Sequence, residues 1–198
     1  NDTADFSALT VNLTVNLNTG VTTHTNRTLT ATAGQLDTTM HGRPVELALE
    51  SREVFGVCGA ACLMPRRVYA ELGGFDESFF FSHEDVDLSY RARLLGYRCR
   101  YVADAVVAHR GSGTSGRTTA FVVRLAHRNA EWLYFKNTPP GLLIRSLPSH
   151  VAYTVAAAVY FARIGRLGAF VRGKLDAIAG MGAIRESRRR VQASRRVS

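Results

Sequence analysis

The chain has 198 residues, of which 46% are hydrophobic and 21% charged, and it carries a formal net charge of +9. This length allows one domain, or one domain with an appendage, and the composition excludes a globally disordered chain. The charge is uneven, because residues 1–140 hold 14 basic and 14 acidic residues whereas residues 141–198 hold 11 basic residues and only Asp176 and Glu186 as acids. Any electrostatic partner is therefore expected at the C-terminus.

The N-terminal stretch is rich in threonine and begins with a clear strand pattern. Residues 9–17 read LTVNLTVNL and alternate strictly between apolar and polar side chains, which predicts a half-buried strand. Asn18-Thr19-Gly20 is a turn signal, and the run 21–32 could pair back as a hairpin. The pattern then dissolves, so residues 33–44 are expected to form a polar loop, with a short strand or helix over 45–53.

An apolar stretch with small residues at its centre covers residues 54–64 and reads VFGVCGAACLM. Small residues permit close approach of another group to the backbone. Pro65 suits a first helical position, so a short helix is expected from there through Leu72, ended by Gly73-Gly74.

The three cysteines are Cys58, Cys62 and Cys99. Their number is odd and they form no CxxC pair, which favours thiols in a reducing compartment. We expect buried, reduced thiols.

A second helix is expected from about Ser82 to Gly96. Ser82 with Asp85 three positions later resembles a capping box, and Glu84 and Asp85 would lie in the first turn, where the helix dipole favours negative charge. Gly96 is a suitable C-terminal cap. Asp87 and Arg91 are four residues apart, which predicts an ion pair on the helix surface or behind a site.

After Gly96, apolar and polar side chains alternate again. Residues 97–101 predict a strand, and a second apolar run at 105–108 ends at His109. Residues 111–119 read GSGTSGRTT and are expected to form a flexible loop, whereas the spacing of apolar residues over 120–136 predicts an amphipathic helix.

The C-terminal part combines apolar and basic segments. Pro139-Pro140-Gly141 should end the preceding helix, and 147–164 is the most hydrophobic stretch. Within it only residues 151–162 are free of charge and histidine, which is shorter than the ~20 residues needed to span a bilayer, so a packed or interfacial helix is expected. The final RESRRRVQASRRVS holds six arginines and one glutamate and is expected to be flexible, to lie on anionic lipid or to bind nucleic acid.

The acidic cluster in GGFDESFFFSHEDVDLSYRARLLGY, residues 73–97, poses the main functional question. Five carboxylates flank a run of three phenylalanines, Phe79 to Phe81. Either the acids only decorate a helix start, or one of them is held in a pocket to move a proton. The phenylalanines are expected to be core residues, with a sugar-stacking platform as the alternative.

Residues 54–148 resemble the acceptor-side half of bacterial family 2 glycosyltransferases of the GT-A fold, particularly rhamnosyltransferase-like members. The matching features are the small-residue strand with Gly59 and Ala60, the GGFDE-FF run at 73–80, the ED-DL--R pattern at 84–91 and the strand ending in His109. The helical region after the catalytic core of such enzymes also resembles residues 128–148.

The resemblance implies an inverting transfer in which an acceptor hydroxyl attacks the anomeric carbon of a nucleotide-diphosphate sugar. In the family the base is the Asp of the Glu-Asp pair, which falls on Asp85 here, with Glu84 as an acceptor contact or a first-turn charge. A histidine at the position of His109 completes the metal shell in some relatives, and a divalent Mn²⁺ or Mg²⁺ ion is implied. Arg110 and Arg117 could then meet diphosphate oxygens, and Gly59 and Ala60 would lie close to substrate.

The chain departs from the family in its N-terminal part. Members carry a nucleotide-binding half with an Asp-x-Asp motif, whereas residues 1–53 are short and threonine-rich, and the only such spacing is Asp85-Val86-Asp87 inside the predicted helix. We therefore expect an α/β chain with a partial GT-A mixed sheet and a C-terminal α-helical extension, incomplete for sugar transfer alone. The expected segments are a β/loop region at 1–53, the acceptor-side core at 54–118, helices at 119–175 and a basic tail at 176–198.

Three functions stay open on the sequence alone. The first is a glycosyltransferase of cell-surface polysaccharide or glycolipid synthesis, acting on a saccharide or lipid-linked acceptor at the inner face of the plasma membrane in the cytoplasm. The second is a non-catalytic binding or membrane-docking module derived from the same half-fold. The third and weakest is nucleic-acid binding through the arginine-rich tail, although no specific nucleic acid is expected.

Overall fold

The computed structural model describes residues 28–37, 51–59, 61–109 and 119–197, and of 28–37 and 103–109 it describes the backbone alone. The described residues divide into two compact units. The sheet unit comprises residues 28–76 and 85–109, and the helical unit comprises residues 77–84 and 119–196. The strand predicted at 9–17 and the loop predicted at 111–119, apart from Thr119, lie outside the described residues.

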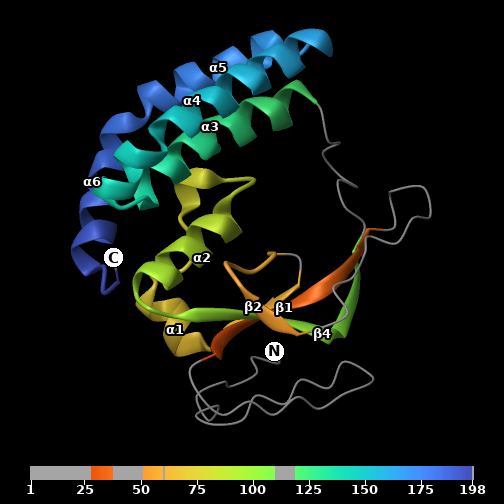
Figure 1. Ribbon diagram of the computed structural model, residues 1–198, viewed down its shortest axis with the longest axis vertical. Coiled ribbons are helices and arrows are strands. Elements are labelled where there is room, and N and C mark those ends of the chain that lie inside the picture. Colours follow the sequence, from red (N-terminus) through yellow and green to blue (C-terminus); the bar gives the residue numbers. More distant parts are fainter. Residues whose placement is uncertain (1–27, 38–50, 60, 110–118, 198) are drawn as a thin grey trace. The chain divides into compact units, whose positions relative to one another are not determined.

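The sheet unit is built around a mixed four-stranded sheet in the order β2-β4-β1-β3 (Figure 1). β1 (Thr28–Asp37) and β4 (Arg98–His109) run parallel at its centre. The short strands β2 (Arg52–Val54) and β3 (Cys62–Leu63) pair antiparallel with β4 and β1, respectively. Parallel neighbours need a crossover connection, and here two helices lie between the paired strands in the chain.

Two sequence expectations change in this sheet. The prediction of a polar loop over 33–44 is wrong for residues 33–37, which continue β1. This stretch has little apolar alternation of its own, and its strand conformation is stabilised by pairing with β4. The two strands expected at 97–101 and 105–108 form one strand, β4, with an irregularity in its register against β1 opposite Ala33 and Gly34.

Helices α1 (Arg66–Glu71) and α2 (Glu84–Leu94) supply the apolar core of the sheet unit. Four buried residues form a cluster there: Val68, Leu72, Leu88 and Ala92. Both helices appear where the sequence predicts them, and Pro65 is the residue before the first helical position of α1.

The helical unit contains α3 (Ala120–Asn137), α4 (Pro140–Arg163), α5 (Leu167–Ala179) and α6 (Met181–Ser194), together with the 3₁₀ turn Glu77–Phe79. Phe79, Trp132, Ala177 and Ile184 form its core. The Trp132 indole donates to the carbonyl of Ala177 at 3.0 Å. A Cβ on Gly180 would lie 2.3 Å from the Trp132 ring, so α5 meets α3 closely only because that residue is glycine.

The C-terminal expectations need two corrections. Pro140 opens α4 as well as following α3, because proline fits a first helical position where its missing N–H is not needed. The basic tail expected at 176–198 is helical through Ser194: Ile184 of α6 is buried, and Arg188 donates to the carbonyls of Phe135 and Thr138. These contacts hold α6 on α3 despite its charge.

Candidate functional site

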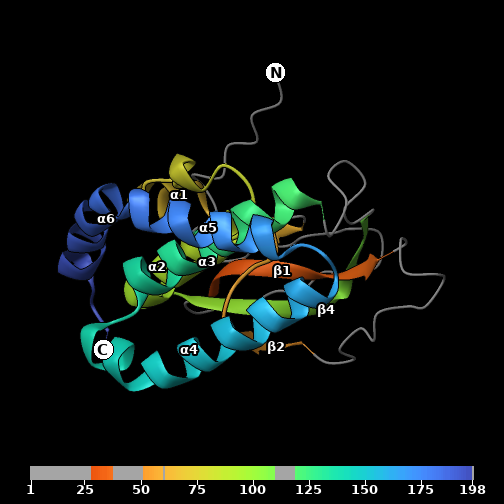
Figure 2. The ribbon, with the colours of Figure 1, turned by 90° about the horizontal axis from the view of Figure 1, so that it is seen from above.

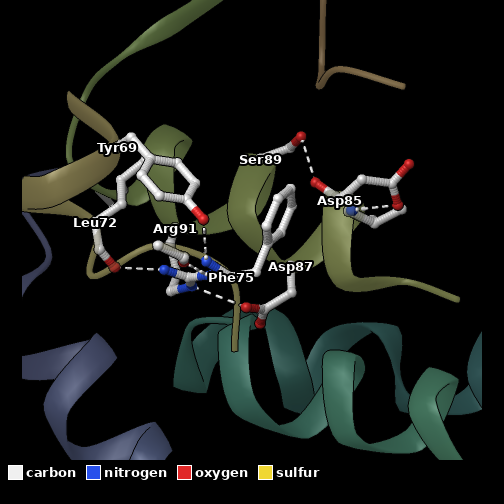
Figure 3. Close-up of polar contacts among 9 residues, drawn as sticks. Tyr69, Leu72, Phe75, Asp85, Asp87, Ser89 and Arg91 are labelled. Carbon is white, nitrogen blue, oxygen red and sulfur yellow. Dashed lines mark hydrogen bonds and ion pairs between the residues drawn. The ribbon is translucent and has the colours of Figure 1, made fainter. Parts of the chain in front are cut away.

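The GGFDE segment begins with a tight turn that ends α1. Gly73 and Gly74 have φ angles of 76° and 71°, a region that other L-residues rarely adopt. The Gly74 amide donates to the Tyr69 carbonyl at 2.9 Å, and the Tyr69 hydroxyl accepts from the Phe75 amide at 3.3 Å (Figure 3). The rings of Tyr69 and Phe75 meet edge to face at 5.7 Å, so the turn has a fixed shape.

Asp87 and Arg91 clamp this turn to α2. The Arg91 Nε donates to Asp87 Oδ2 at 2.8 Å, and the same guanidinium donates to the carbonyls of Leu72 and, at 2.8 Å, of Gly74 (Figure 3). Asp87 is fully buried and Arg91 is 9% exposed. The predicted ion pair is confirmed, but it lies in the interior and joins α2 to the end of α1.

The carboxylate of Asp85, two residues earlier on α2, is held differently. Its Oδ2 accepts from the Gly59 amide at 2.8 Å and its Oδ1 from the Val86 amide at 2.8 Å. Among the described residues Asp85 has no ion-pair partner, and the side chain is half-buried. Each carboxylate oxygen can accept two hydrogen bonds, so both keep capacity for one more donor.

A serine on the next turn connects the backbone of α2 to the small-residue stretch. The Ser89 hydroxyl donates to the Asp85 carbonyl at 2.7 Å and accepts from the Val57 amide at 3.0 Å. A Cβ on Gly56 would lie 2.5 Å from Ser89 Cβ, and one on Gly59 would lie 3.2 Å from Asp85 Cβ. The close approach expected from the small residues is therefore real, and the group approached is α2.

The start of α2 differs from the predicted capping box. The helix begins at Glu84, and Ser82 and His83 both have left-handed backbones, with φ angles of 69° and 71°. The Ser82 hydroxyl lies 2.9 Å from His83 Nδ1 instead of capping the helix. Glu84 Oε2 is buried and accepts no hydrogen bond from the described residues. A buried carboxylate oxygen without a donor is costly, which marks it as a position where a ligand could donate.

In the helical unit, Asn129 of α3 organises the loop before α2. Its side-chain amide, which is fully buried, donates to the carbonyls of Phe79, Phe81 and Ser82 at 2.7–2.8 Å. Phe79 is buried as expected, whereas Phe80 is 77% exposed with a φ of 58°. The expectation of a core role is thus wrong for Phe80, because its strained backbone turns the ring outward.

The other predicted site residues are only partly described. Gly59 contacts Asp85, whereas Ala60, Arg110 and Arg117 lie outside the described residues. His109 ends β4, and its side chain lies outside the description. Within the described part of the chain, no three His, Cys, Asp or Glu side chains come together to hold a metal ion.

All three cysteines are free thiols, as expected. Cys99 is buried, but Cys58 is half-buried and Cys62 is exposed, so the expectation of burial holds for Cys99 alone. Local desolvation, followed by the negative carboxylate of Asp85, raises the pKa of the Cys62 thiol. The raised pKa keeps the Cys62 thiol protonated at neutral pH.

Comparison with known proteins identifies the protein family to which the chain belongs. Residues 3–132 match the family described as "Glycosyltransferase like family 2". The match covers more than half of the chain, and the chain therefore belongs to this family. It begins at residue 3, so the threonine-rich N-terminal segment, which resembles the family less clearly, is part of the matched region.

Individual relatives point to one kind of transferase. The chain is 31% identical over 99 residues to the N-acetylglucosaminyl-diphospho-decaprenol L-rhamnosyltransferase of Mycobacterium tuberculosis strain CDC 1551 / Oshkosh, and equally to that of strain ATCC 25618 / H37Rv. These alignments cover 50% of this chain and 32% of each relative, so the chain spans about a third of the length of the curated relatives it matches. No solved structure matches the chain significantly.

Proposed function

We propose that the chain is part of an inverting glycosyltransferase with a GT-A fold, which moves a sugar from a nucleotide diphosphate to an acceptor hydroxyl. The family supplies the reaction class, and the mixed sheet with flanking helices is compatible with part of that fold. Because the relatives are named for a diphospho-decaprenol substrate, we propose a saccharide on a polyprenyl diphosphate as the acceptor class. The setting would be synthesis of a cell-surface polysaccharide at the cytoplasmic face of the plasma membrane.

In the proposed mechanism Asp85 is the base. The acceptor hydroxyl gives its proton to the Asp85 carboxylate while its oxygen forms the bond to the anomeric carbon. The bond from that carbon to the diphosphate oxygen breaks on the opposite face, and the nucleotide diphosphate leaves with the electron pair. Attack from the opposite face inverts the anomeric configuration.

The observation that carries this proposal is how Asp85 is held. Two neutral amides, those of Gly59 and Val86, fix both carboxylate oxygens, and no described cation neutralises them. A carboxylate fixed by neutral donors keeps its charge and one accepting position on each oxygen, which is what a positioned base needs. Glu84, the preceding residue, adds a buried oxygen without a donor, to which we assign a contact with an acceptor hydroxyl.

A divalent metal and a diphosphate site are further proposals, and they rest on side chains of this chain that the structure does not describe. The described residues bring no group of three ligands together, so they do not fit a metal site and no step above involves one. We assign His109, Arg110 and Arg117 as candidates for metal and diphosphate contacts, to be tested by substitution.

The test is a transfer assay with a nucleotide-sugar donor and a short-chain polyprenyl-diphosphate acceptor, run with the chain and with the full-length product of its gene. We expect product with inverted anomeric configuration by NMR, and about 10²–10⁴-fold slower turnover for Asp85→Asn. Transfer with retention, or unchanged turnover in Asp85→Asn, would reject the mechanism. Donor binding without transfer in any form would favour the non-catalytic module.

A further inference from the structure

Helix α4 exposes an apolar stripe that no described part of the chain covers. None of its 24 residues is buried, and it is long and apolar enough to cross a membrane by length and composition. Large apolar side chains recur every three or four residues on its exposed side, with Ile144 at 75% exposure; they are Ile144, Leu147, Val151, Val155 and Val159. This periodicity places them on one face of the helix.

Helix α5 repeats the pattern. Its exposed apolar residues, spaced by three or four, are Leu167, Val171, Leu175 and Ile178. Its other face buries Phe170, Gly173 and Ala177 within the helical unit. α4 and α5 meet where the first ends and the second begins, and there Phe161 stacks on Phe170 with ring centroids 5.8 Å apart (Figure 2). The two exposed stripes together are named here the α4–α5 face.

The charges around the α4–α5 face have one sign. α4 contains no acidic residue, and Arg145 and Arg163 are both exposed. They are 18 residues apart, which is five helical turns, so they lie on one line along the helix. Arg166 and Arg172 are exposed at α5, whose single acid, Asp176, is paired with Arg124. A positive rim around an apolar face complements an anionic lipid surface.

The opposite side of α4 packs against α3. These contacts favour a helix that lies on a membrane over one that crosses it. His150 Nε2 lies 2.9 Å from Glu131 Oε2, and its ring stacks on Tyr134 at 3.9 Å. The Tyr134 hydroxyl donates to the Leu143 carbonyl at 2.8 Å, and Phe161 packs against His127 with ring centroids 4.8 Å apart. These contacts occur from one end of α4 to the other. If α4 crossed a bilayer, all of them would break, and the polar groups that make them would lie in lipid without hydrogen-bond partners.

We propose that the α4–α5 face docks into the interfacial layer of an anionic bilayer, with both helices in the membrane plane and the arginines at the headgroups. The attachment is the apolar face, not the arginine-rich C-terminal segment. In that segment Arg188 is bound to carbonyls of the helical unit, and Glu186 pairs with Arg189 and Arg190. The proposal requires no sugar transfer, and its test contains no acceptor.

The test measures partitioning of the purified chain onto vesicles of phosphatidylglycerol and phosphatidylcholine by co-sedimentation. Val155→Glu and Ile178→Glu place charge in the middle of each stripe. We expect each to lower the partition coefficient by a factor of roughly 10 to 100, because a buried aliphatic side chain is replaced by a charged one. Ala193→Glu on α6, also exposed, is the matched control and should retain most of the binding.

The charge component is tested separately. Arg145→Gln with Arg163→Gln should weaken binding to anionic vesicles by roughly tenfold or more and leave the weaker binding to pure phosphatidylcholine unchanged. Absence of wild-type binding, or equal binding by Val155→Glu, would overturn the proposal. So would light scattering that shows a wild-type dimer and a Val155→Glu monomer with unchanged vesicle binding, because the face would then cover a second copy.

Discussion

Asp85 and Asp87 are two residues apart on α2, yet the structure uses them in opposite ways. Asp87 is fully buried and bound to Arg91, which also binds the two carbonyls at the end of α1. Asp85 is half-buried and bound to two neutral amides. A carboxylate paired with a buried cation has a structural role. A carboxylate held by two amides is not paired with a cation, and its oxygens can still accept hydrogen bonds from another molecule.

The difference follows from the direction each side chain takes from the helix. Residues two apart lie on different faces of a helix, so Asp87 binds Arg91, which reaches the turn after α1, while Asp85 accepts from the amide of Gly59. The same motif therefore contains a structural carboxylate, Asp87, and the proposed catalytic base, Asp85, and experiments can separate their roles.

The largest effect on stability is expected at Asp87. Asp87→Ala leaves the Arg91 guanidinium buried without its counter-charge, and we expect a loss of about 3–5 kcal/mol in the free energy of unfolding. Asp85→Ala removes only two hydrogen bonds to amides near the surface, which should cost about 1–2 kcal/mol. Urea unfolding of the two variants measures both, and equal losses would contradict the distinction.

The helical unit buries an ionisable group that has no ion-pair partner among the described residues. His127 packs against Phe161 and Phe170, its Nδ1 has no partner among the described residues, and burial lowers its pKa from 6.5 to about 4, aided by the charges of Lys174 and His83. The unfolded chain therefore binds a proton between pH 6.5 and 4 that the folded chain does not. The contribution of the neutral, buried imidazole to the free energy of unfolding is fully present above pH 6.5. As the pH falls towards 4, the free energy of unfolding decreases by up to about 3 kcal/mol.

His127→Leu should remove that part of the pH dependence. The measurement is urea unfolding at pH 7 and pH 4.5 for wild type and variant. The wild type should lose more stability than the variant between these values, and identical losses would show that His127 is not buried in its neutral form.

A smaller effect is expected where the backbone meets α2. Gly56→Ala would put a Cβ 2.5 Å from Ser89 Cβ, so the strand end must move, at a cost of about 1–3 kcal/mol. Gly141→Ala is the matched control, because nothing lies within 4 Å of its Cβ position and helical alanine is favoured over glycine. Thermal unfolding should show opposite signs for the two substitutions, and a neutral Gly56→Ala would argue against this packing.

Patterns local in sequence predicted much of the fold. The helices α1, α2 and α3 follow from apolar spacing, proline and glycine signals. The extension of β1 beyond Thr32 could not be predicted in this way, because its strand character depends on pairing with β4, more than 60 residues away. The helical state of α6 was obscured by its arginines, although Met181, Ile184 and Val191 recur at helical spacing.

The sequence singled out the residues of the candidate site but not the contacts that hold them in place. The Glu84-Asp85 pair followed from a resemblance, whereas the roles of Ser89 and Asn129 come from contacts 32 and 47–50 residues distant in sequence. For Asn129 a signal existed: it is a polar residue between Leu125 and Trp132 on the apolar face of α3. For Ser89, a small hydroxyl on a helix gives no indication of what it will bind.

The most direct test compares Asp85→Asn with Asp87→Asn in the same transfer assay and the same thermal melt. We expect Asp85→Asn to melt close to wild type while turnover falls at least about 100-fold, and Asp87→Asn to melt at a clearly lower temperature while the folded fraction retains most of its turnover. Near-normal turnover in Asp85→Asn, with its only defect in melting, would show that this carboxylate serves the fold and would contradict the proposed catalytic role.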